Sequence, residues 1–161
     1  MPTVRPATPQ DRDAVWRIFR AVVAEGTTYA YPADLSRAAG LQRWMEAPRA
    51  CYVAEQEGRV VGTYYLKDNQ PGRGAHVCNA GYMVQAEARG QGIGRRMCEH
   101  SLTKARRFGY RAMQYNLVVA TNEAAIHLWK QMGFAIVGTL PEAFDHPEQG
   151  LVDAYVMFRQ L

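Results

Sequence analysis

The stretch Arg89-Gly90-Gln91-Gly92-Ile93-Gly94-Arg95-Arg96 is the most informative part of this sequence. It follows the segment His76–Val84, which reads as a strand, and it opens a helix predicted over residues 92–108. Backbone N–H groups at a helix N-terminus lack intrahelical partners and lie at the positive end of the dipole, so they bind phosphate. Glycines let the backbone approach a phosphate closely, and arginines add charge-assisted contacts. The stretch therefore predicts a phosphate-binding turn between a strand and a helix.

The glycine spacing of this turn separates it from two common nucleotide-binding motifs. The glycines run G-x-G-x-G, whereas the dinucleotide fingerprint runs G-x-G-x-x-G. The Gly-Lys-Ser/Thr ending of a nucleoside-triphosphate loop is missing. A plain strand-to-helix connection stays open as an alternative, because a glycine-rich turn alone has little specificity.

Hydrophobic periodicity on both sides of the turn predicts the remaining elements. Helices are expected over residues 9–24, 35–46, 92–108 and 122–132, and strands over 51–57, 59–67, 76–84, 112–119, 134–139 and 151–158. With one strand before the first helix, the order is β-α-α-β-β-β-α-β-α-β-β. The strand–helix–strand unit over 76–119 should be a right-handed parallel crossover, and the neighbouring hairpins should be antiparallel. This predicts an α/β fold, with a mixed sheet covered by helices on both faces.

The strand predicted over residues 112–119 enters the predicted site, so the face on which each of its side chains lies matters for function. Period-two alternation assigns its residues to two faces: Met113, Tyr115, Leu117 and Val119 on one, and Gln114, Asn116 and Val118 on the other.

Length and composition fit one soluble domain over residues 1–161. The longest apolar runs have about four residues, far short of the ~20 that a membrane span requires, and no apolar segment typical of a signal peptide follows Met1. The three cysteines have no regular spacing, which predicts free thiols and a reducing, cytoplasmic location. No Cys/His cluster has zinc-ligand spacing, so no metal is expected.

The charge distribution is uneven, although the net charge is only +4. Seven basic residues and one acid, Glu99, lie between Arg89 and Arg111. A solvated helix face would explain this, and so would a site for a polyanionic ligand. Nucleic acid is the weaker form of the second interpretation, because no aromatic residues interleave on this helix.

Two segments together resemble the GNAT acetyltransferases. Arg89, Gly92 and Gly94 occupy the three defining places of that family's pyrophosphate-binding pattern, Gln/Arg-x-x-Gly-x-Gly/Ala. The segment Asn122–Phe134 looks like the family's helix followed by Gly-Phe. The resemblance extends over about residues 3–160 and implies the GNAT fold and an N-acetyltransferase that uses acetyl-CoA and no metal.

The resemblance also implies which groups hold the cofactor. The pyrophosphate would lie on the turn, whose candidate residues are Arg89, Gly90, Gln91, Gly92, Ile93, Gly94 and Arg95. Main-chain groups of Tyr82, Met83 and Val84 would hydrogen-bond the pantetheine like an added strand. Asn122 would contact the pantetheine arm.

The chain departs from the family pattern at the usual general acid. The family commonly has a tyrosine four residues before the Gly-Phe pair, where this chain has Trp129. An indole N–H cannot serve as an acid near neutral pH. Another group, with Tyr82, Tyr115 and Cys78 as candidates, would protonate the thiolate, or the thiolate would leave unaided. Trp129 itself reads more simply as a core aromatic residue that packs the last helix.

Two asparagines occur inside predicted strands, where asparagine is disfavoured. The segments around Asn79 and Asn116 resemble those of fungal L-azetidine-2-carboxylate acetyltransferases, which use asparagines at these positions and at that of Asn122 for substrate fixation and catalysis. By this resemblance Asn79 and Asn116 are the catalytic candidates, and they would orient the amine and carboxylate of a small amino-acid-like acceptor. Satisfaction of backbone groups is the alternative.

The loop Glu25–Pro32 is expected to cover the acceptor pocket, as the corresponding loop does in the family. Tyr29 and Tyr31 would line the pocket. Glu25 would act as a base or bind a cationic acceptor, unless it is simply a solvated residue at a helix end.

The function expected from these residues is acetyl transfer to the amine of a small molecule, such as an amino acid or an analogue. Two alternatives stay open: a protein or peptide N-acetyltransferase, and a non-catalytic CoA-binding module suggested by the missing tyrosine. GNAT relatives are often dimers, so a homodimer is allowed, and no nucleic-acid or membrane partner is expected.

Overall fold

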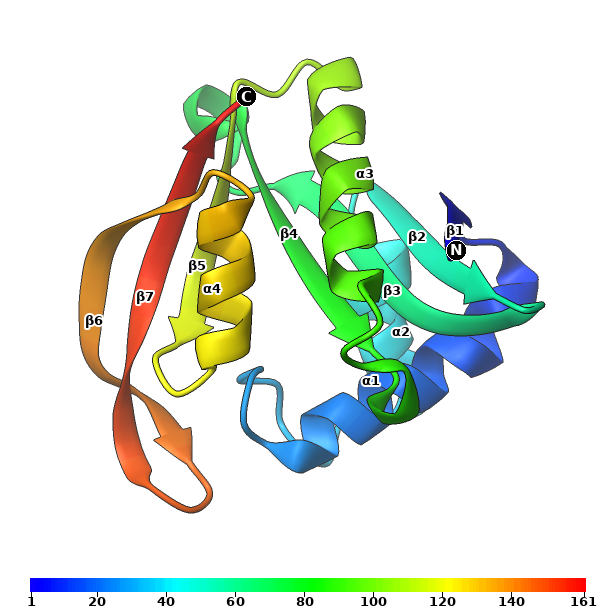
Figure 1. Ribbon diagram of the computed structural model, residues 1–161, viewed down its shortest axis with the longest axis horizontal. Coiled ribbons are helices and arrows are strands. Elements are labelled where there is room, and N and C mark those ends of the chain that lie inside the picture. Colours follow the sequence, from blue (N-terminus) through cyan, green and yellow to red (C-terminus); the bar gives the residue numbers. More distant parts are fainter.

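The computed structural model describes residues 1–161 and has the predicted order of elements (Figure 1). All seven strands join one sheet in the order β1-β2-β3-β4-β5-β7-β6. Only β4 and β5 pair in parallel, and every other neighbouring pair is antiparallel. The predicted mixed α/β sheet is confirmed.

The helices and strands lie close to their predicted positions. The strands are β1 (Thr3–Pro6), β2 (Ala50–Gln56), β3 (Arg59–Asp68), β4 (Val77–Val84), β5 (Ala112–Val119), β6 (Ala135–His146) and β7 (Gly150–Gln160). The α-helices are α1 (Arg12–Glu25), α2 (Arg37–Leu41), α3 (Ile93–Arg107) and α4 (Glu123–Gln131). None of them is long and apolar enough to cross a membrane.

Two elements differ from the prediction. The helix predicted over 35–46 is divided: α2 begins after Ser36, whose side chain accepts a hydrogen bond from the Ala39 N–H, and it continues as a π-helical turn over Gln42–Glu46. Strand β6 continues beyond the predicted end at residue 139, because a register shift against β7 between Leu140 and Phe144 accommodates Pro141 and the positive φ of Glu142.

The sheet has a hydrophobic core on each face, as predicted. One core lies under α3 and α4 and includes Met97, Tyr64 and Met157. The other lies under α1 and α2 and includes Phe19 and Trp44. Figure 1 shows these two pairs of helices on opposite sides of the sheet. Side chains at alternate positions of β3 and β4 therefore point toward different helix pairs.

The face assignment predicted for β5 is wrong beyond Tyr115. The register against β7 shifts between Tyr115 and Val118, which breaks the period-two alternation. As a result Val118 is buried in the same core as Met113 and Tyr115, whereas Leu117 is only half-buried. The bulge therefore changes which side chains of β5 face each side of the sheet beside the cleft described below.

The parallel pairing of β4 and β5 is very short. Register partners are confined to Val77 with Ala112 and Cys78 with Met113. Beyond these pairs the two strands diverge, as Figure 1 shows, toward the side of the molecule where the loop after α1 lies. The main-chain groups that β4 and β5 would otherwise exchange are left without their partner strand.

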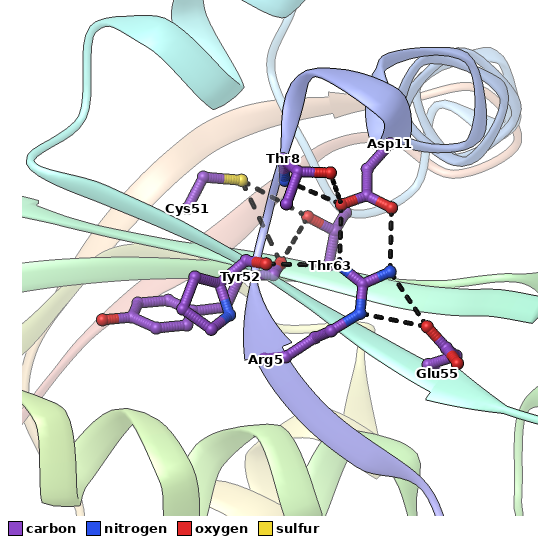
Figure 2. A network of polar contacts seen from close by, with 8 residues as sticks. Arg5, Thr8, Asp11, Cys51, Tyr52, Glu55 and Thr63 are labelled. Carbon is purple, nitrogen blue, oxygen red and sulfur yellow. Dashed lines mark hydrogen bonds and ion pairs between the residues drawn. The ribbon is translucent and has the colours of Figure 1, made fainter.

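A polar network ties β1 to the start of α1 (Figure 2). The guanidinium of Arg5 binds both carboxylate oxygens of Asp11, at 2.8 and 3.0 Å, and also binds Glu55. Asp11 further accepts hydrogen bonds from the N–H and hydroxyl of Thr8, at 2.7 and 3.1 Å. The hydrogen bonds from Arg5 lower the pKa of the buried Asp11 carboxyl below its ordinary value.

We predict that Asp11→Asn lowers the free energy of unfolding by about 1–2 kcal/mol near pH 7, because the helix start loses its cap and Arg5 loses its main partner. Since the folded pKa of Asp11 is lowered, the stabilisation is present above its ordinary pKa and is lost as pH falls through the folded value. Urea unfolding at neutral and acidic pH measures this. Glu55→Gln, in the same network but more exposed, should cost less than 1 kcal/mol. A deficit in Asp11→Asn that did not shrink with acidification would contradict the assignment.

Candidate active site

A cleft of about 1000 Å³ opens where β4 and β5 diverge. Its walls come from these two strands, the loop after α1, the first turn of α3 and one side of α4. This volume is at the upper end for small-molecule sites. Most of the residues predicted to form the site line this cleft: Glu25, Tyr29, Asn79, Tyr82, Met83, Val84, Arg89, Gly90, Gly92, Ile93, Gly94, Arg95, Asn116 and Asn122. The exceptions are Gln91 and Tyr31.

The glycine turn presents an open helix N-terminus to the cleft. Gly92 is the N-cap of α3 and has φ of 80°, and no side chain caps this helix. The first intrahelical bond runs from the Arg96 N–H to the Gly92 carbonyl, so the preceding N–H groups have no helical partner. Gly90 also has a positive φ of 75°, and a Cβ at either glycine would meet nothing within 4 Å. The turn therefore has both the unpaired donors and the free space that a phosphate group requires.

Arg89 and Glu25, both predicted site residues, bind each other. The two guanidinium nitrogens of Arg89 donate to the two carboxylate oxygens of Glu25 at 3.1 and 2.7 Å. This bidentate pair joins the end of α1 to the glycine turn and is exposed to solvent. It accounts for Glu25 without a role as base.

The hydroxyl of Tyr29 occupies the main chain of β4 inside the cleft. It donates to the Tyr82 carbonyl and accepts from the Tyr82 N–H, both at 2.7 Å. It therefore takes the position that a neighbouring strand would hold. Burial raises the pKa of Tyr29, so its hydroxyl stays protonated at neutral pH.

The alternation of β4 assigns its main-chain groups to two sides. The Gln85 N–H donates to the Val61 carbonyl of β3 at 2.8 Å, whereas the Tyr82 groups point into the cleft. Because successive residues of a strand direct their peptide groups to alternate sides, Val84 shares the orientation of Tyr82 and Met83 that of Gln85. Of the three residues predicted to bond pantetheine, Met83 thus directs its peptide groups to β3.

Tyr31 and Gln91 lie outside the cleft. The ring of Tyr31 packs on Phe19 and Tyr29, with centroids 5.0 and 5.9 Å apart, in the core under α1. Gln91 is exposed, and its side-chain amide donates to the Glu87 carbonyl. Sequence pattern alone could not separate these residues from their cleft-lining neighbours.

Asn79 bridges β4 and β5 directly beyond their last register pair. Its Nδ2 donates to the Gln114 carbonyl at 2.9 Å, and its Oδ1 accepts from the Tyr65 hydroxyl at 2.8 Å. The side chain is buried. This bonding matches the alternative in which the asparagine satisfies a backbone group, and it marks the closed end of the cleft.

Asn116 lies on the exposed rim of the same end. Its Oδ1 accepts from Gln114 at 3.0 Å, and its Nδ2 donates to the Asn69 side chain at 2.7 Å. Asn116 and Asn79 both line the cleft, and Gln114 links them, because its carbonyl bonds Asn79 and its amide bonds Asn116. The structure therefore brings the two predicted asparagines together.

Asn122 is the N-cap of α4. Its side chain accepts from the Ala125 N–H at 3.3 Å while the residue also lines the cleft. Because N-caps are commonly asparagine, this position has a structural reason for its residue in addition to any contact with a ligand.

Trp129 packs in the core, in agreement with the core-aromatic interpretation. Its ring lies 5.0 Å from that of Tyr82 and 4.9 Å from that of Tyr115. The hydroxyls of these two tyrosines bond each other at 3.0 Å, and burial raises their pKa well above the ordinary value. Cys78 is fully buried outside the cleft lining, and burial raises its pKa to about 12. Cys78 is therefore not placed to protonate a thiolate in the cleft.

The sequence analysis did not single out two cleft residues of β3. Tyr65 lines the cleft beside Asn79, and Lys67 pairs with Asn79 across the antiparallel register. A lysine at the end of a predicted strand is unremarkable by pattern, and only the register of β3 on β4 brings it to the site. No group of three or more His, Cys, Asp or Glu side chains is arranged to hold a metal ion.

The acetyltransferase (GNAT) family model matches residues 13–134. The chain belongs to the GNAT family. N-acetyltransferase aca1 of Schizosaccharomyces pombe is 39% identical over 98 residues, which is 60% of this chain and 47% of that protein. The chain thus spans less than half the length of this curated relative.

Solved GNAT structures share the whole fold. A GCN5-related N-acetyltransferase from Kribbella flavida superposes with a TM-score of 0.95 at 43% identity and covers 99% of this chain and 98% of that one. The acetyltransferase yncA from Salmonella typhimurium, solved with its cofactor acetyl-CoA, has a TM-score of 0.88 at 24% identity over 100% of this chain and 94% of that one. The predicted GNAT fold is confirmed, and the second comparison supports the fold alone.

We predict opposite stability effects for alanine at two glycines of the GNAT turn. Gly92→Ala should lower the free energy of unfolding by about 1 kcal/mol, because an L-residue at φ of 80° is strained. Gly94→Ala, inside the first turn of α3, should be neutral or stabilising by up to about 1 kcal/mol, since its Cβ would make an ordinary 3.5 Å contact with Leu128. Urea unfolding of both variants checks this, and equal effects would contradict the observed turn.

Proposed function

We propose that this chain is an acetyl-CoA-dependent N-acetyltransferase that acetylates the amine of a small molecule of the amino-acid class by direct transfer. The observation that carries the proposal is the cleft itself. It joins an uncapped helix N-terminus at one end to a polar, closed end at the other, between strands whose facing peptide groups lack a partner strand. Family membership supplies the reaction type.

The residues present fit coenzyme A. The N–H groups around Gly92 and Gly94 would hold the pyrophosphate, and the nearby Arg95 would add charge. The cleft-facing peptide groups of Tyr82 and Val84 would bond the pantetheine as an added strand. Asn122 would lie beside the pantetheine arm. When bound, acetyl-CoA supplies the activated acetyl group.

The polar groups of this chain can support the transfer step. A peptide N–H at Tyr82 or Val84 would donate to the thioester oxygen as negative charge develops there. An amine with a pKa of about 10.4, such as that of lysine, must lose a proton before it attacks. Asn79 and Asn116 take no proton at neutral pH, so they would orient the acceptor while water takes the proton.

The leaving thiolate has no obvious acid in this cleft. Trp129 stands at the position of the usual tyrosine and does not release its indole proton near neutral pH. Tyr82 and Tyr115 are held in hydrogen bonds to each other. We infer that the thiolate leaves unaided or takes its proton from water.

We propose a single catalytic domain over residues 1–161 and a cytoplasmic location, supported by three free cysteines. We propose a homodimer through β6, because this edge strand exposes Ile136, Val137 and Leu140.

The proposed reaction predicts release of free thiol from acetyl-CoA when a suitable amine is present. A panel of amino acids, cyclic imino acids including azetidine-2-carboxylate, polyamines and short peptides would be followed by thiol detection. We expect turnover with amino-acid-like acceptors. Exclusive turnover of peptides would indicate a protein N-acetyltransferase, and tight CoA binding without turnover would indicate a non-catalytic binding module.

The Tyr29 hydroxyl makes a separate prediction about cofactor binding. If pantetheine bonds the Tyr82 peptide groups, the hydroxyl must first leave them, so Tyr29→Phe should tighten CoA binding about 5- to 10-fold by removing this competitor. Calorimetry with CoA measures the effect, and Tyr31→Phe, outside the cleft, is the matched control. Unchanged affinity for CoA would indicate that pantetheine does not bond the Tyr82 peptide groups. Weaker affinity would indicate that the Tyr29 hydroxyl itself binds the cofactor.

A further inference from the structure

The cleft lining has more positively charged side chains than negatively charged ones. Glu25 is the only acidic residue in the lining, and Arg89 binds both of its carboxylate oxygens. The other formal charges are those of Arg95 and Lys67. Lys67 takes part in no ion pair. The cleft thus holds a lysine without an anionic partner.

The contacts of Lys67 hold its charge at the closed end of the cleft. Lys67 pairs with Asn79 across β3 and β4, so both side chains lie on the sheet face that carries α1 and α2. Its ammonium group lies over the ring of Tyr65, 5.3 Å from the centroid, and the hydroxyl of that ring bonds Asn79. These contacts place the ammonium beside Tyr65 and Asn79 at the rim of the cleft, where Lys67 is exposed to solvent.

The distance along β4 separates Lys67 from the phosphate end. Asn79 lies opposite Lys67, and the glycine turn begins only after β4 ends at Val84, a strand length of roughly 16 Å from Asn79. Arg95 lies at that far end, in the first turn of α3. A diphosphate on the glycine turn would therefore be too far away to form an ion pair with Lys67.

The cleft-lining groups near Lys67 are neutral. Asn79, Asn116 and the Tyr65 hydroxyl line this end of the cleft, and they hydrogen-bond to one another or to Gln114 and Asn69. Amides and a hydroxyl can orient a ligand, but none of them balances a positive charge. An anionic group on the acceptor would do so through a charge-assisted hydrogen bond.

We propose that Lys67 binds a carboxylate, or a similar anionic group, of the acceptor molecule, and so determines that the acceptors are amino acids rather than simple amines. This inference rests on the proposed function. It adds a binding residue on β3 to the asparagines on β4 and β5, so that three adjacent strands each contribute one group to the acceptor. The charge of Lys67 would also disfavour acceptors that are wholly cationic, such as polyamines.

The test compares paired acceptors that differ only in this charge, such as azetidine-2-carboxylate and its carboxamide, or proline and prolinamide. The parent protein should prefer the carboxylates. Lys67→Met should lower kcat/KM for the carboxylates about 10- to 100-fold, the loss of one charge-assisted hydrogen bond, and leave the amides unchanged. Lys67→Arg should recover part of the loss.

Lys104→Met is the matched control, because Lys104 also lies over a tyrosine ring, that of Tyr52 at 6.0 Å, but outside the cleft. It should leave both classes of acceptor unaffected. A readout independent of turnover is calorimetry of the N-acetylated carboxylate product in the presence of CoA, where Lys67→Met alone should weaken binding.

Two outcomes would overturn the role of Lys67. One is an equal loss for carboxylates and amides in Lys67→Met, and the other is a parent protein that acetylates the amides as well as the carboxylates. Failure of the proposed function has a different signature: the parent protein then releases no thiol with any amine, or shows no calorimetric affinity for CoA.

Discussion

The limited pairing of β4 with β5 is the constraint on which the site depends. Two register pairs hold these parallel strands together before they separate. In a continuous sheet, the peptide groups of Tyr82 and Val84 would form hydrogen bonds with the neighbouring strand. The separation leaves them facing a cleft, where an unpaired buried peptide group is costly and therefore needs another partner. In this structure the Tyr29 hydroxyl is that partner for Tyr82, at 2.7 Å to both of its groups.

The separation itself is stabilised by side chains. Asn79 joins β4 to the Gln114 carbonyl immediately beyond the last pair, so a side-chain amide replaces the next rung of the ladder. On the other face, the rings of Tyr82, Tyr115 and Trp129 fill the space beneath α3 and α4. A tryptophan in place of a tyrosine on α4 thus enlarges an aromatic contact in the core. In exchange, the cleft lacks the tyrosine hydroxyl, a group that could exchange a proton there.

The sequence predicted the order of elements because its hydrophobic periods and turn residues agree with the final packing, as in the amphipathic α3 and the glycine at its start. The resemblance to acetyltransferases of this family, rather than periodicity, predicted that Asn79, Asn116 and the glycine turn belong to one site. Prediction from the sequence failed where tertiary contacts override a local pattern. The bulge in β5 buries Val118 in place of Leu117, and the Arg89–Glu25 pair joins two residues that had been given separate roles. Lys67 could not be found, because its position depends on the register between β3 and β4.

The two ends of the cleft differ in a way that fits two ligands meeting between the strands. The glycine turn offers backbone donors at a helix N-terminus, which suit a phosphate regardless of side-chain identity. The closed end offers side chains only: a lysine, two asparagines and a tyrosine hydroxyl, each from the sheet itself. Because the first set depends on backbone geometry and the second on residue identity, the proposed cofactor end is the one constrained by the fold. We infer that substitutions on three strands would alter the proposed acceptor end without disturbing the turn, so that one GNAT fold could serve different amines.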